Sequence, residues 1–113
     1  PEPPEKPVNI NLSDTPKGQL VALPNKTEIA LGENSFTIKQ NKSWKNETSY
    51  EYTAVRTVLI DYIKQSDKWA WSLVIVERDS SHRSVYAHDV EYSALNWLQY
   101  FLFTQIIKRS EED

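Results

Sequence analysis

The C-terminal segment is the part of the sequence that most restricts the fold. A first apolar stripe at helical spacing consists of Leu95, Leu98, Leu102 and Ile106. Further apolar side chains cover most of the remaining circumference: Trp97, Tyr100, Phe101, Phe103 and Ile107. One face of a small sheet cannot cover such a helix. Either a neighbouring helix and the N-terminal tail cover the rest, or a partner chain or an apolar ligand does.

The sequence before this helix predicts short strands and a hairpin. Turn residues separate apolar runs at 20–23, 27–31 and 36–38, which is typical of an antiparallel meander. Apolar residues alternate on both faces of residues 68–77, and we expect residues 84–88 to return as the hairpin partner. The last helix then begins after a cap at Asp89 and ends near Lys108.

A second helix is predicted within residues 48–65. Thr48 and Glu51 have the spacing of a capping box, and apolar residues recur at helical spacing after them. Several β-branched residues in this segment are equally suited to a strand. We therefore expect an α+β domain, with two helices packed on one face of a small, mostly antiparallel sheet.

Composition limits the classes of function. The net charge is −3, and the basic residues are scattered, which disfavours nucleic-acid binding. The most apolar stretch, 94–107, is interrupted by polar residues and is too short to span a bilayer. The chain contains no cysteine, so it has no disulfide framework. Prolines in residues 1–16 predict a tether before a single domain at 17–113, and the start at Pro1 suggests that a preceding segment was removed.

Residues for catalysis are few. His88 and Asp89 could form half of a metal or proton-transfer site, but no third ligand stands at a recognisable interval. The two glycines cannot supply a phosphate-binding loop. We therefore expect no catalytic residues, no metal and no cofactor, and a small hydrolase using His88 with Asp89 remains an alternative.

Aromatic residues are the main excess, with four tryptophans and six tyrosines. Trp69 and Trp71 are better explained by core packing than by ligand binding. Trp44 stands in a polar run, where it either anchors a partner or folds back onto the sheet. Four N-glycosylation sequons begin at Asn11, Asn25, Asn41 and Asn46, and they leave a secreted eukaryotic domain as an alternative.

The order of expected elements is a meander, a capped helix, a tryptophan-rich hairpin and a final helix. Together with the passage 85–90 leading into 93–95, this order resembles the periplasmic domains of the ToxR and VtrA group of membrane-anchored transcription regulators. The chain lacks the cysteine pair of ToxR, which excludes redox sensing. The resemblance implies a periplasmic sensor domain, tethered to the inner membrane, that pairs with a small partner protein to enclose an amphipathic ligand such as a bile salt.

These expectations assign residues to two surfaces. The partner-binding candidates on the last helix are Trp97, Tyr100, Phe101 and Phe103. The candidates for an anionic ligand head group on the hairpin are His82, Arg83 and Tyr86. A plain protein-interaction module, such as a toxin immunity protein, is the alternative for a small acidic chain.

Overall fold

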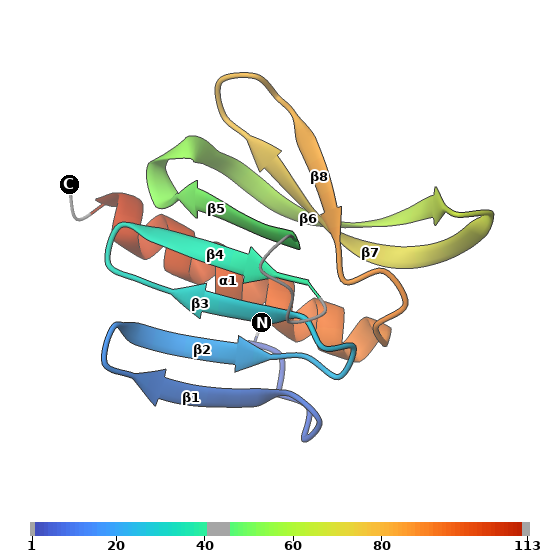
Figure 1. Cartoon of the computed structure of the whole chain (residues 1–113), viewed down its shortest axis with the longest axis horizontal. Helices are drawn as coiled ribbons and strands as arrows, with labels where there is room; N and C mark the ends of the chain where they lie inside the picture. Colours follow the sequence, from blue (N-terminus) through green and yellow to red (C-terminus); the bar gives the residue numbers. More distant parts are fainter. Residues whose placement is uncertain (1, 41–45, 112–113) are drawn as a thin grey trace.

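The computed structural model describes residues 2–40 and 46–111, which form two antiparallel sheets and a C-terminal helix (Figure 1). The first sheet has the order β1-β2-β3-β4-β5, and the second has the order β6-β7-β8. The α+β class expected from the sequence is confirmed. The first sheet contains β1 (Asn11–Thr15), β2 (Gly18–Ala22), β3 (Glu28–Leu31), β4 (Ser35–Lys39) and β5 (Glu47–Glu51). The remaining elements are a 3-10 turn η2 (Tyr52–Ala54), β6 (Val55–Gln65), β7 (Lys68–Glu77), β8 (Arg83–Tyr86) and α1 (Tyr92–Glu111).

The five-stranded sheet is a meander with one buried face. Ile29 pairs with Val21 on one side and with Ile38 on the other, and all three side chains are buried. Alternation of the side chains turns the intervening residues outward. The three strands predicted between residues 20 and 38 are therefore confirmed as β2, β3 and β4.

Ordered structure begins earlier than the sequence suggested. The expected tether at 1–16 contains β1, which pairs with β2 from Asn11 to Thr15, and it also contains Ile10, which is fully buried in the core. The tether therefore ends before Ile10. The polar, fully exposed pattern of β1 gave no apolar alternation by which to recognise a strand.

The helix expected within residues 48–65 is wrong. This segment forms β5, η2 and β6, so Thr48 and Glu51 lie in a strand and make no capping box. β-branched residues outweighed the helical spacing, since their side chains pack well on a pleated surface and lose rotamer freedom in a helix. Among the described residues there is consequently one α-helix, not two.

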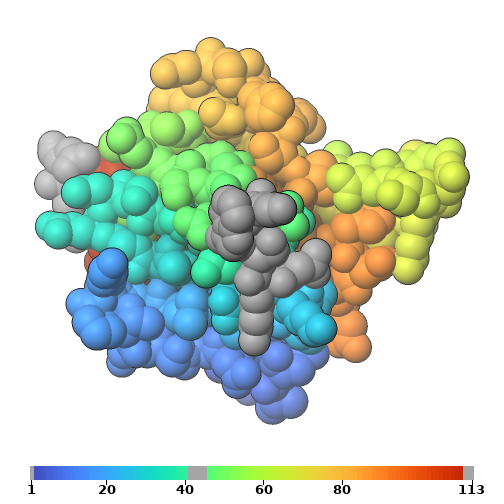
Figure 2. All heavy atoms as spheres, viewed as in Figure 1, coloured from blue at the N-terminus to red at the C-terminus, as the bar shows by residue number. Residues whose placement is uncertain are grey.

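The second sheet is dominated by a long hairpin. The strand predicted at 68–77 is confirmed as β7, which pairs with β6 from Val55 to Gln65. Ser66 and Asp67 both have positive φ, as a two-residue hairpin turn with the twist of the flanking strands requires. The return strand β8 pairs only with Leu73–Val76. Residues 61–72 therefore continue as a two-stranded extension, here called the arm, which projects from the body at the right of Figures 1 and 2.

Helix α1 is buried by both sheets. It lies behind β3 and β4 in Figure 1, and its buried side chains share one core cluster with Phe36 of the first sheet and Leu73 of the second. At 3.6 residues per turn, the buried positions from Ala94 to Ile106 occupy about half of the helix circumference. The second sheet therefore covers the surface for which the sequence had suggested a second helix.

Two tyrosines join the sheets inside this core. The hydroxyl oxygens of Tyr50 in β5 and Tyr86 in β8 are 2.6 Å apart, and the two rings meet edge to face. Burial raises the pKa of Tyr50 well above its ordinary value, and the hydrogen bond with Tyr86 adds to this effect, partly offset by one with Ser84. The protein is therefore most stable while this phenol keeps its proton.

Alkaline pH should unfold the protein through these tyrosines. Because the folded-state pKa of Tyr50 exceeds the unfolded value of about 10, its contribution is fully present below that pH and is lost as pH rises toward the folded-state value. Urea unfolding measured from neutral to strongly alkaline pH should show this decline. Tyr50→Phe should make the decline shallower without abolishing it, because burial also raises the pKa of Tyr52. An equally steep decline in Tyr50→Phe would contradict this assignment.

Gly18 should tolerate no side chain. Its φ of 148° is open to glycine, and an added Cβ would collide with the carbonyl oxygen of Leu31 in the neighbouring strand. Gly18→Ala should lower the free energy of unfolding by roughly 1–3 kcal/mol, as measured by urea denaturation. Gly32→Ala is the matched control, since its Cβ would lie 3.1 Å from one carbonyl oxygen and needs only a small adjustment. Equal losses in both variants would contradict the argument.

Candidate functional site

Four aromatic side chains form an exposed cluster where the arm meets the start of α1. This aromatic patch consists of Tyr62, Trp69, Trp71 and Tyr92. Each ring remains between 45% and 55% exposed. The ring of Tyr62 lies 5.5 Å from that of Trp69 and 5.2 Å from that of Trp71, and Trp71 meets Tyr92 edge to face at 5.4 Å. The rings therefore contact each other and leave about half of their surface to solvent.

The patch is the continuation of a core face beyond the core. On β7, alternate side chains place Trp69 and Trp71 on the same face as the fully buried Leu73. Tyr62 stands directly opposite Trp71 in the register. Because α1 begins only at Tyr92, this face passes the end of the helix and loses its cover. The arm, which projects from the body in Figure 2, thus presents exposed aromatic side chains outside the core.

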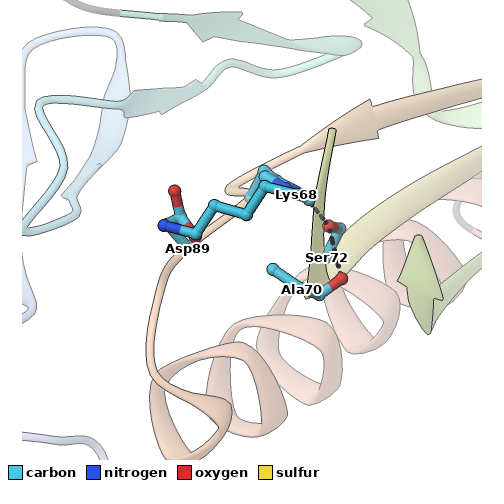
Figure 3. A network of polar contacts seen from close by, with 5 residues as sticks. Lys68, Ala70, Ser72 and Asp89 are labelled. Carbon is cyan, nitrogen blue, oxygen red and sulfur yellow. Dashed lines mark hydrogen bonds and ion pairs between the residues drawn. The ribbon is translucent and has the colours of Figure 1, made fainter. Parts of the chain in front are cut away.

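The strand edges of the arm are protected by polar groups. The backbone N–H of Tyr62 donates to the carboxylate of Asp61 at 2.9 Å. On the β7 side, the ammonium group of Lys68 lies 2.9 Å from the carboxylate of Asp89, which precedes α1 (Figure 3). Charged side chains at strand edges discourage pairing with another strand. The face of the arm, and not its edge, is therefore the surface available for contact.

His88 contacts the base of the arm through Ser72. Its Nδ1 lies 2.7 Å from the hydroxyl oxygen of Ser72. That hydroxyl also donates to the carbonyl of Ala70 at 3.3 Å (Figure 3). One hydroxyl hydrogen cannot serve both contacts, so we infer that the imidazole donates from Nδ1. Ser72 is 0% exposed, and the Asp89 carboxylate is engaged by Lys68. A serine without solvent access is poorly placed to attack a substrate.

The helix residues assigned to partner binding divide into two groups. Trp97 is 7% exposed and stacks on Phe101, and both belong to the packing around the core. Phe103 is half-buried, and Tyr100 is 44% exposed on the outer side of the helix. Internal packing thus accounts for much of the apolar circumference, and Tyr100 is the member of this set that is exposed.

The residues assigned to a ligand head group lie apart from the aromatic patch. Tyr86 is buried against Tyr50, while His82 and Arg83 are exposed. Arg83 pairs with Val76, at the end of β7 opposite to the arm. The structure does not bring these residues together with Trp69 or Trp71. Trp44 and the sequon asparagine Asn41 lie outside the described residues.

The aromatic patch was missed because its two strands were interpreted differently. The sequence predicts that Trp69 and Trp71 lie in a strand and face the core, and it predicts that Tyr62 lies in a helix. The pairing of Tyr62 with Trp71 was therefore hidden. Tryptophans at alternate positions beside a two-residue turn of Ser66 and Asp67 were the available signal, since such a hairpin can extend beyond its sheet.

Three hollows in the described surface have no ring of the aromatic patch in their lining. One of about 280 Å³ is lined by polar residues around Arg109, whose guanidinium group stands over the ring of Tyr52 at 5.4 Å. Within residues 2–40 and 46–111, no three acidic or histidine side chains are close enough to hold a metal ion. In the same residues, no helix has the length and apolar character needed to cross a bilayer.

Comparison with known proteins gives no relative for this chain. No family model matches it, and neither a curated protein nor a solved structure does. The resemblance to the ToxR and VtrA group therefore stays a prediction, and one of its four elements, the capped helix, is replaced by strands.

The two polar contacts at the base of the arm should differ in strength. His88→Ala removes one of the two hydrogen-bond partners of the buried Ser72 hydroxyl and should lower the free energy of unfolding by about 1–3 kcal/mol. Lys68→Ala breaks an ion pair whose two side chains are largely exposed, and it should cost at most about 1 kcal/mol. Urea denaturation of both variants measures the difference. A larger loss in Lys68→Ala would contradict the role given to His88.

Proposed function

We propose that this chain is a non-catalytic binding domain that, together with a partner chain, holds an amphipathic ligand with flat apolar rings, such as a bile salt. The observation that carries the proposal is the aromatic patch, in which four contacting rings stay half exposed beside an otherwise well-packed core. Exposed apolar patches on a small domain commonly mark binding surfaces.

The rings offer considerable binding energy. An aromatic side chain buries roughly 150–250 Å² when fully covered, so a half-exposed ring retains roughly 100 Å² for a ligand. Covering that area contributes about 2 kcal/mol per ring before ordering and desolvation costs are subtracted. Flat fused rings match the faces of Trp69 and Trp71, and a charged head group can remain in water at the rim of the patch.

The shape of the surface supports the partner chain in this proposal. Small-molecule sites bury about 70–90% of a ligand in a concave pocket. The aromatic patch lies on a projecting arm, and its rings line none of the three hollows, of which the nearest includes Glu91 beside Tyr92. A ligand resting on Trp69 and Trp71 would keep one side in water. A second protein surface placed over the patch would complete the enclosure.

The contacts at the base of the arm support a domain without a catalytic role. His88 and Asp89 are the best candidates for chemistry. Nδ1 of His88 contacts the buried Ser72, its Nε2 is buried without a hydrogen-bond partner, and Asp89 pairs with Lys68. The arrangement fixes the arm to the segment before α1. We therefore propose a positioning role for these residues.

Within this proposal the domain is a sensor. Following the resemblance, it would lie in the periplasm and belong to a membrane-anchored transcription regulator. Ligand held between two chains would favour one assembly over another and so shift a population of states. The differential affinity for the two states would set the size of the response.

A plain protein-interaction module is the second candidate, and the same surface favours it. Aromatic residues at the centre of a patch with charged residues such as Lys64 and Asp67 at its rim correspond to the usual anatomy of protein interfaces. The two candidates differ in whether a small molecule is needed for the partner to bind.

Ligand binding should be visible in tryptophan fluorescence. Titration of the chain with taurodeoxycholate, below its micelle concentration, should change the emission in a saturable manner because the rings of Trp69 and Trp71 leave water. Trp69→Ala and Trp71→Ala should each weaken the apparent affinity roughly tenfold, which is a loss of about 1.4 kcal/mol in binding free energy.

Leu12→Ala is the control for this titration. Leu12 is also an exposed apolar residue, but it lies on β1, away from the arm, so its loss should leave the affinity unchanged. No saturable response in the parent chain, or equal affinities in the parent chain and both tryptophan variants, would overturn the ligand part of the proposal.

A further inference from the structure

We propose that residues 87–92, which lead from β8 into α1 and are here called the strap, hold the arm in the position that the aromatic patch needs, and that release of the strap lowers the affinity of the patch. This inference rests on the proposed function, because it names how the same surface is regulated. Three observations carry it: the path of the strap around the arm, the strain in its backbone, and the weakness of the contacts that hold it.

The aromatic patch is divided between two elements. Tyr62, Trp69 and Trp71 lie on the arm, whereas Tyr92 is the first residue of α1. Among the described residues, the strands of the arm pair only with each other, because β8 pairs with residues 73–76. A two-stranded ribbon has little stability of its own in water. A flat ligand that contacts both Trp71 and Tyr92 therefore needs the arm to be held against the start of the helix.

The strap passes around the edge of β7 that β8 leaves free. Side-chain alternation places Lys68 and Ser72 on the face of β7 opposite to Trp71. Two consecutive residues of the strap contact that face. Nδ1 of His88 lies 2.7 Å from the hydroxyl oxygen of Ser72, and the carboxylate of Asp89 lies 2.9 Å from the ammonium group of Lys68 (Figure 3). The last residue of the strap then meets Trp71 on the other face, so the strap contacts the arm from both sides.

The backbone of the strap is strained. Ala87 and Asp89 have φ angles of 55° and 80°, in the left-handed region that residues with a Cβ disfavour. The N–H of Val90 donates to the carbonyl of Ala87 at 3.3 Å, so residues 87–90 form a turn with Asp89 in the third position. A positive φ at this position favours glycine or asparagine. The contacts of the strap therefore keep it in a conformation that its own residues disfavour.

The contacts that oppose this strain are weak. Nε2 of His88 is buried and has no hydrogen-bond partner, which favours any state in which water reaches it. The side chains of Lys68 and Asp89 are 63% and 47% exposed, and ion pairs so exposed contribute little. We therefore expect the held and released states of the arm to differ little in free energy. A ligand that contacts both the arm and the helix start would shift the population toward the held state.

Hydrogen–deuterium exchange of the full chain without ligand, followed by mass spectrometry, tests the strap. The double variant Lys68→Ala, His88→Ala removes both contacts and should speed amide exchange in residues 61–72 at least fivefold. Exchange in β4 is the internal reference and should change far less, because release frees the arm and leaves the core packed. Equal acceleration in both regions, or none in the arm, would overturn the proposal.

Lys64→Ala is the matched control for this exchange experiment. It removes a lysine of the arm whose ammonium group pairs with Asp67 at 3.9 Å, and the strap makes no part of that pair. Exchange in the arm should stay close to that of the parent chain. Acceleration as large as in the double variant would show that loss of any charge on the arm suffices, and it would overturn the role of the strap.

The strain is tested in the Lys68→Ala background. Asp89 has already lost its ion pair there, so adding Asp89→Gly relieves the positive φ and removes no charged partner. The added glycine should recover part of the exchange protection that Lys68→Ala loses in the arm. Exchange as fast as in Lys68→Ala alone, or faster, would overturn the strained strap.

Titration with taurodeoxycholate tests the link between the strap and the patch. The double variant Lys68→Ala, His88→Ala should bind at least fivefold more weakly than the parent chain, although neither residue belongs to the aromatic patch, because apparent affinity falls with the fraction of molecules in the held state. Lys64→Ala removes the same charge from the arm and should keep the parent affinity. Taurodeoxycholate should in turn slow exchange in the arm of the parent chain. Unchanged affinity in the double variant would overturn regulation by the strap.

The two proposals fail in different ways. A parent chain without a saturable response to taurodeoxycholate would overturn the ligand part of the proposed function, while exchange without ligand would still decide whether the strap holds the arm. If taurodeoxycholate binds in a manner that depends on Trp69 and Trp71, but loss of both strap contacts leaves exchange in the arm unchanged, then the proposed function stands and the strap is wrong.

Discussion

The fold depends on the burial of one helix between two sheets. The apolar side chains of α1 cover more than half of its circumference, and such a helix is stable in a small domain only when it is covered from two sides. The meander covers one side and the β6-β7-β8 sheet covers the other, so that a single core cluster includes residues from both. The hydrogen bond between Tyr50 and Tyr86 joins the two sheets within that core. The positions of the remaining elements follow from this arrangement.

The same constraint accounts for the exposed arm. The hairpin β6-β7 needs only its inner half to cover α1, since β8 ends its pairing at Leu73 and the helix begins at Tyr92. Its outer half has aromatic side chains on the same face, but it extends past the end of α1, so these side chains remain exposed. Asp61 and the Lys68–Asp89 pair protect the strand edges, which leaves the face itself as the surface able to take a partner.

Prediction from sequence succeeded where a single pattern dominated and failed where two patterns competed. Alternating apolar residues in β7 and the apolar density of α1 identified both elements. Residues 48–65 carried a helical spacing and β-branched residues at once, and the tertiary pairing of β6 with β7 decided between them. The missed helix then hid the aromatic patch, because Tyr62 and Trp71 become neighbours only across a strand pair.

The central claim is that the aromatic face of the arm, and not the helix, is the contact surface of this domain. The indole N–H signals of the tryptophans in nuclear magnetic resonance spectra test it most directly when the concentration of taurodeoxycholate is varied. The signals of Trp69 and Trp71 should shift progressively with concentration, while that of the buried Trp97 should stay constant. Constant positions for Trp69 and Trp71, or an equal shift for Trp97, would contradict the account.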